Sequence, residues 1–108
     1  MNTINSNLEN LIQKIDNIAL NILLPLRAEK VIDSKIMNEF HSLLDELDNA
    51  LKLEQTVPKK IVGIVWFVFT AMLAEAEHAK EERDSIEIAA WKIADKLQHI
   101  FGPHFDVY

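Results

Sequence analysis

Apolar residues recur at helical spacing in four stretches of the chain. In the first, second and fourth stretches the intervals alternate between three and four residues, which places the apolar side chains on one face of a helix. The positions are Leu8, Leu11, Ile15, Ile18 and Ile22; Ile36, Phe40, Leu43, Leu47 and Ala50; and Ile86, Ala90, Ile93, Leu97 and Ile100. Each of these stretches predicts an amphipathic helix with one buried and one solvated side.

The third stretch, residues 61–74, carries apolar side chains on every side and no charge. Such a helix must be surrounded by other helices or covered by a partner. It would span about 21 Å, less than the ~30 Å hydrocarbon core of a membrane. Glu75 and Glu77 follow at once, so we expect a buried helix and not a membrane span. A peripheral membrane contact, with Lys59 and Lys60 at the helix start, is an alternative.

Residues that start or stop helices separate the stretches. Pro25 disfavours helical angles at Leu24, so we expect a break or kink there. Asp33 or Ser34 can accept the free amide hydrogens of the second helix, and Pro58 suits the first turn of the third. The first three helices are therefore expected to be joined by short connections.

The boundary between the third and fourth helices is less sharply marked. Asp84 and Glu87 have the spacing of a capping box, which predicts a turn near residues 83–85. Neither Gly nor Pro lies there, so one long helix is an alternative. Gly102 is expected to end the fourth helix.

These elements predict an all-α fold in a single domain that covers residues 1–108. Short connections favour an antiparallel bundle of about four helices. The apolar third helix is expected at the centre of the bundle, because the other helices could then cover it on all sides.

The composition excludes several classes of protein. The chain has 108 residues, of which 49% are hydrophobic, with no Cys and only Gly63 and Gly102 as glycines. Glycine-rich phosphate loops, disulfides and Cys-based zinc sites are therefore excluded. The first residues include neither a basic segment nor an apolar run, so no signal peptide is expected and we expect a cytoplasmic protein.

Charge is concentrated in two acidic stretches. The net charge is −6, and residues 39–54 and 75–87 each carry −4. No basic strip is present, which disfavours nucleic-acid binding. Solvated helix faces account for the acidic stretches, although a basic protein partner would also be compatible with them.

Glu75 and His78 form the sharpest local pattern in the sequence. Their Glu-x-x-His spacing places a carboxylate and an imidazole on one helix face, as in metal-binding bundles. Glu82 and His99 are the further candidate ligands. A second copy of the motif is missing, so a divalent-metal site is the alternative to a bundle without a cofactor.

Catalytic groups are not evident. Most Ser and Thr side chains are accounted for as helix caps, so no nucleophile is assigned. His41, Asp45 and Asp48 share the side of the second helix opposite its apolar stripe, which indicates a solvated surface. A binding protein is therefore expected, in preference to an enzyme.

Trp66, Phe67 and Phe69 make the third helix bulky on all sides. Some of these aromatic side chains must pack in the core, and the others could dock a partner helix or a second copy of the chain. We therefore expect a small cytosolic protein that acts by protein–protein interaction. It would be a homo-oligomer, an adaptor, an inhibitor or an immunity-type binding module.

Overall fold

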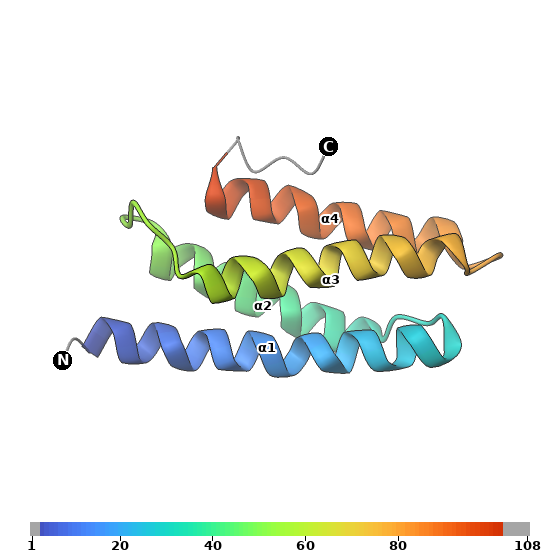
Figure 1. Ribbon diagram of the computed structural model, residues 1–108, viewed down its shortest axis with the longest axis horizontal. Coiled ribbons are helices and arrows are strands. Elements are labelled where there is room, and N and C mark those ends of the chain that lie inside the picture. Colours follow the sequence, from blue (N-terminus) through green and yellow to red (C-terminus); the bar gives the residue numbers. More distant parts are fainter. Residues whose placement is uncertain (1–2, 103–108) are drawn as a thin grey trace.

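Four helices make up the chain in the computed structural model, which describes the backbone of residues 3–102 and the side chains of residues 7–102. They are α1 (Thr3–Glu29), α2 (Ser34–Leu51), α3 (Lys59–Glu77) and α4 (Arg83–Phe101) (Figure 1). No strand occurs in that part of the chain, so the prediction of an all-helical fold is confirmed.

Each helix packs against two others. Helix α1 contacts α2 and α3, and α4 likewise contacts α2 and α3, so the diagonal pairs are α1 with α4 and α2 with α3. The links between consecutive helices alternate between the two ends of the bundle (Figure 1). Helix α3 therefore has the same number of helix neighbours as the other three, and one of its sides faces outward.

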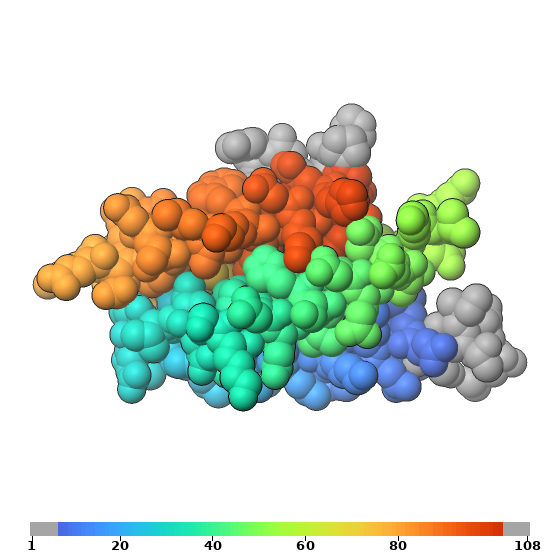
Figure 2. Space-filling view, turned by 180° about the vertical axis from the view of Figure 1, so that it is seen from behind, coloured from blue at the N-terminus to red at the C-terminus, as the bar shows by residue number. Residues whose placement is uncertain are grey.

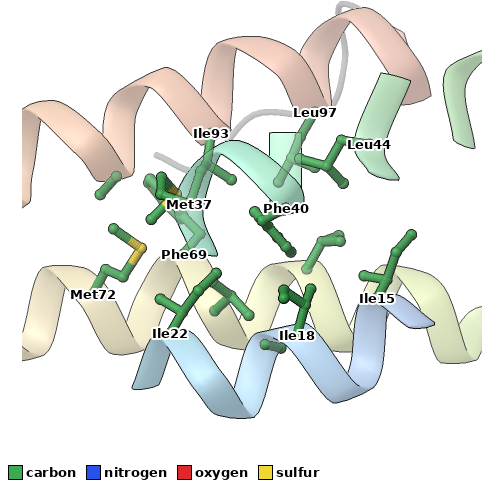
Figure 3. Packing of buried hydrophobic residues seen from close by; sticks show 14 of the residues in the cluster. Ile15, Ile18, Ile22, Met37, Phe40, Leu44, Phe69, Met72, Ile93 and Leu97 are labelled. Atoms are coloured by element: carbon green, nitrogen blue, oxygen red, sulfur yellow. The ribbon is translucent and has the colours of Figure 1, made fainter. Parts of the chain in front are cut away.

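The core consists of the inward apolar stripes of all four helices. Ile15, Phe40, Phe69 and Leu97, one from each helix, are at most 1% exposed (Figure 3). Full burial of a side chain of this kind contributes roughly 1.5–3 kcal/mol. Among the side chains that the structure describes, none that is buried is polar or charged. Hydrophobic packing therefore holds the bundle together.

Of the break or kink predicted at Pro25, the break does not occur, because α1 continues through this residue to Glu29. A proline inside a helix costs about 3 kcal/mol. Leu26 is fully buried, and its carbonyl accepts a 2.9 Å hydrogen bond from the amide of Lys30. Tertiary packing of the last turn thus outweighs the local preference. The helix then ends at Lys30, whose φ of 57° is left-handed.

The remaining boundaries follow the sequence signals more closely. The Oδ1 atom of Asp33 accepts hydrogen bonds from the amides of Lys35 at 2.9 Å and Ile36 at 3.2 Å, so Asp33 caps α2. Residues 78–82 separate α3 from α4, slightly before the predicted turn. Gly102, with φ of 105°, ends α4.

Candidate functional site

An apolar outer face on α3 is the main candidate site. We define the outer face by Gly63, Trp66, Phe67, Thr70 and Ala74, which lie on the side of α3 opposite its buried stripe. Trp66 is 40% exposed and Phe67 is 51% exposed. The sequence predicts that the third helix is buried on every side. Within one chain, the outer face of this helix is instead exposed.

Of the three aromatic residues predicted to contact a partner, two lie on this face and one does not. Phe69 is 1% exposed and belongs to the core. Its ring lies 6.3 Å from that of Trp66 and 5.2 Å from that of Trp91 on α4, between centroids. Phe69 therefore supports the face from beneath and is not available for binding.

The polar group of Thr70 is satisfied within α3. Its hydroxyl oxygen lies 3.0 Å from the carbonyl oxygen of Trp66 and 3.3 Å from that of Phe67, and the hydroxyl donates to these acceptors. Thr70 therefore needs no hydrogen bond from a partner. The outer face can be covered by apolar groups without leaving this hydroxyl unpaired.

Helix α1 extends the apolar surface on one side of α3. Leu20 is 57% exposed and Leu24 is 62% exposed. A groove of about 330 Å³ runs between the two helices. It is lined by Asp16, Ala19, Leu20, Leu23, Lys60, Gly63, Ile64 and Phe67. The surface is therefore apolar along its length, with charged residues at one end.

Two features shape this groove. The guanidinium carbon of Arg27 lies 5.7 Å from the centre of the Phe67 ring, a distance at which cation and ring attract each other. Gly63 leaves the groove open, because a Cβ atom added there would have no described atom within 4 Å. The position of Phe67 is thus held from one side, while space remains beside it.

The charges at the two ends of α3 oppose its helix dipole. Exposed Lys59 and Lys60 occupy the first turn, which has no acidic residue, and exposed Glu77 ends the helix, whose last turn has no basic residue. Negative charge is normally favoured at the start of a helix and positive charge at its end. Contacts within the helix therefore do not explain this arrangement.

Glu75, the first predicted metal ligand, is paired with a cation from α1. Its Oε1 atom lies 2.6 Å from the Nζ atom of Lys30, which also donates to the carbonyl of Arg27 at 3.3 Å. The hydrogen bond from Lys30 lowers the pKa of the Glu75 carboxyl below its ordinary value. An ammonium group thus contacts one of the two carboxylate oxygens through which Glu75 could ligate a metal ion.

The other predicted ligands do not join Glu75 in one site. His78 caps the end of α3 and Glu82 precedes α4, and both are exposed. His99 lies 17 residues beyond Glu82, about 25 Å along α4. Its Nε2 atom is 3.1 Å from Oδ2 of Asp48. In the described part of the chain, no three His, Asp or Glu side chains gather in a group that could hold a metal.

A polar seam between α2 and α4 was not anticipated from the sequence. Asp45 Oδ1 lies 3.0 Å from Lys96 Nζ, and Asp48 pairs with His99. Residue numbers rise together along both helices, so α2 and α4 run in the same direction. Figure 2 shows the two helices side by side. The sequence does contain a pattern that matches this contact. Lys92, Lys96 and His99 on α4 are spaced at the same intervals as His41, Asp45 and Asp48 on α2.

His41 lies half-buried in this seam, where its environment disfavours the charged imidazole. Burial is the main reason that its pKa is lowered, and the positive charges of Lys96 and Lys92 lower it further. Asp45 acts in the opposite direction. The cluster therefore contributes to the contact between α2 and α4, while the side chain of Asp45 remains 66% exposed to solvent.

A larger hollow lies between α1 and α2 and has a different chemistry. Its volume is about 830 Å³, and its lining includes Asn17, Asn21, Asn38, Ser42 and Glu46. This hollow was not predicted, because most of its residues come from the polar sides of two helices. Most of its lining can form hydrogen bonds, in contrast to the groove beside α3.

Two further findings complete the description of the molecule. Over the described residues, none of the helices has the length and hydropathy that crossing a bilayer requires. Comparison of the chain with family models, with curated proteins and with solved structures found no match.

Proposed function

We propose that this chain acts by binding another protein through the outer face of α3 and the adjoining surface of α1. The observation that carries the proposal is the half-exposed ring of Phe67, which lines a groove together with exposed Leu20. Contiguous exposed apolar side chains, bordered by charged residues, are typical of interaction surfaces. Asp16 and Lys60 supply such charges at one end of the groove.

The shape of the surface also supports binding. Energetically important contacts tend to be aromatic side chains that fit into pockets, and this face offers both a ring at Phe67 and a groove beside Gly63. A partner that covers the face would also surround α3. Helix α3 would then take the central position that its all-round apolar sequence predicts.

A homo-oligomer is the form of this function that the face favours, with adaptor, inhibitor or immunity-type roles built on the same surface. The acidic stretches 39–54 and 75–87 are compatible with a basic partner as well. Stretch 39–54 lies on α2 and the link that follows it, away from the outer face of α3, so self-association and a basic partner are not mutually exclusive.

The proposal can be tested by placing a photo-crosslinking amino acid at position 67 in cells that express the chain. Leu53, which is 94% exposed and lies in the link between α2 and α3, provides the matched control position. We expect a crosslinked protein, either a second copy or a different chain, at position 67 and not at position 53. Equal crosslinking at both positions, or none at position 67, would contradict the proposal.

A further inference from the structure

Charges and side-chain sizes follow a regular order along the outer face of α3 and its two ends. Six residues of α3 follow one another at intervals of three, four, three, four and three residues. They are Lys60, Gly63, Phe67, Thr70, Ala74 and Glu77. This spacing forms a continuous seam along one side of a helix, as in coiled coils. It begins with a cation, ends with an anion and is uncharged between them.

We propose that a second copy of this chain docks on this seam, with its α3 running antiparallel to the first. The inference rests on the proposed function and names the partner. In the antiparallel arrangement, Lys60 of each copy faces Glu77 of the other at both ends. The large ring of Phe67 faces the smaller Thr70, and Gly63 faces Ala74. The seam is thus complementary to itself under a two-fold rotation.

A parallel arrangement lacks this complementarity. Equal positions would then face each other, so that Lys60 would meet Lys60 and Glu77 would meet Glu77. The two Phe67 rings would also compete for one space, while the small side chains would leave gaps. Charge and size therefore both favour the antiparallel orientation.

The reversed charges at the ends of α3 have an explanation in this dimer. Lys59 and Lys60 lie at the positive end of their own helix dipole, and Glu77 lies at the negative end. In an antiparallel pair, the start of one helix lies beside the end of the other. The lysines of one copy would then approach the carbonyl end of its partner, and Glu77 would approach the amide end.

Gly63 gives independent support. Glycine weakens a helix interior relative to alanine. Packing within the chain does not require it, since an added Cβ at this position would have no described atom within 4 Å. A missing side chain at the seam allows a second helix to approach closely. The dimer thus accounts for a residue that the single chain does not need.

Disulfide crosslinking tests the orientation directly, because the chain contains no Cys. Lys60→Cys and Glu77→Cys proteins are prepared separately, mixed under reducing conditions and then oxidised. We expect a covalent dimer in the mixture and little in either protein alone, because the antiparallel seam places position 60 beside position 77. Covalent dimers in each protein alone would indicate a parallel pair and overturn the proposal.

Charge exchange tests the same contact without oxidation, with sedimentation equilibrium as the measurement. Lys60→Glu and Glu77→Lys are each expected to raise the dimer Kd about tenfold at low salt, because each creates like-charged pairs at both ends. The double variant should return to within about threefold of the original Kd. Lys35→Glu, on α2, is the matched control and should leave the Kd unchanged. A double variant as weak as the single ones would contradict the antiparallel contact.

Gly63→Leu tests the close approach of the helices. The added side chain should fill the groove and abolish the dimer, while circular dichroism and the thermal midpoint show that the monomer remains folded. A Gly63→Leu protein that dimerises normally would overturn the proposal.

Failure of this inference can be distinguished from failure of the proposed function. If the wild-type chain is monomeric up to about 100 µM, well above a micromolar Kd, self-pairing is wrong. If photo-crosslinking at position 67 then captures a different chain, the proposed function stands. If it captures neither kind of chain, both are wrong.

Discussion

The ammonium group of Lys30 lies 2.6 Å from the carboxylate of Glu75 and thereby joins the end of α1 to the end of α3. Lys30 adopts a left-handed conformation with φ of 57°, the conformation in which glycine most often ends a helix. Its side chain also donates to the carbonyl of Arg27 in the last turn of α1. Lys30 thus occupies a strained backbone position, and its side chain donates hydrogen bonds to two acceptors.

Lys30→Gly and Lys30→Ala separate the backbone strain from the ion pair. Both variants lose the contact with Glu75, but only Gly relieves the left-handed strain, which costs an ordinary residue about 1–2 kcal/mol. We therefore expect the Gly variant to have the larger free energy of unfolding, by that amount. Urea unfolding of the two proteins measures the difference. Equal stabilities would show that position 30 is not strained.

Glu75→Gln should have an effect on stability that depends on pH. The hydrogen bond from Lys30 lowers the pKa of Glu75 below its ordinary 4.5, so the folded state favours the carboxylate. The stabilising contribution is complete above pH 4.5 and is lost as pH falls through the lowered pKa. The pair is partly exposed, so salt should reduce the effect.

Thermal midpoints of wild type and Glu75→Gln, measured from about pH 7 to about pH 3, test this expectation. The wild type should be the more stable protein near neutral pH, and the difference should shrink towards pH 3. Glu87→Gln provides a control in a more exposed pair with Arg83. A difference for Glu75→Gln that stays constant over the whole range would contradict the role given to Lys30.

The pairing of Glu75 also shows what a local sequence pattern cannot reveal. The Glu75–His78 spacing that makes a metal site an alternative is visible in the sequence, whereas Lys30 is 45 residues away from Glu75. Similarly, the rule for Pro25 is local, but the burial of Leu26 that overrides it depends on the assembled bundle. The one-sided stripes of α1, α2 and α4 were predictable because burial follows directly from their spacing.

Because α3 is apolar on all sides, its sequence does not show which side faces the core. Periodicity alone could not assign Phe67 to the surface and Phe69 to the core, since both neighbours are aromatic. The charged residues at its two ends provided the missing signal, because Lys60 and Glu77 mark the side that remains in contact with water. The intervals between them identify the outer face.

Lys96→Met should raise the pKa of His41. In the wild type, burial of the imidazole and the charge of Lys96 lower this pKa, and Asp45 raises it. Removing Lys96 eliminates a positive charge near His41 and also frees Asp45 from its 3.0 Å ion pair. Both effects raise the pKa of His41. Titration of the His41 ring protons by NMR measures the shift. Lys14→Met, on α1, is the control and should leave the titration unchanged.

The same seam predicts a loss of stability in mild acid. The pKa of His41 is lowered from 6.5, so the folded state favours the neutral imidazole. The contribution of His41 to the free energy of unfolding is therefore complete above pH 6.5 and is lost as pH falls through the lowered pKa. His41→Gln should remove this part of the pH dependence. A His41→Gln protein whose stability still falls as steeply below pH 6.5 would show that other groups cause the loss.

Phe69→Ala and Phe67→Ala should affect different properties, although the two residues are only two positions apart. Phe69 is fully buried beneath Trp66 and Trp91, so its truncation should cost about 3–5 kcal/mol of unfolding free energy. Phe67 is half exposed, and its truncation should cost about 1 kcal/mol in the monomer. Phe67→Ala should instead weaken association. Urea unfolding at low protein concentration and sedimentation equilibrium measure the two effects separately. A Phe67→Ala protein that is strongly destabilised as a monomer would place this ring in the core and remove the basis for an outer binding face.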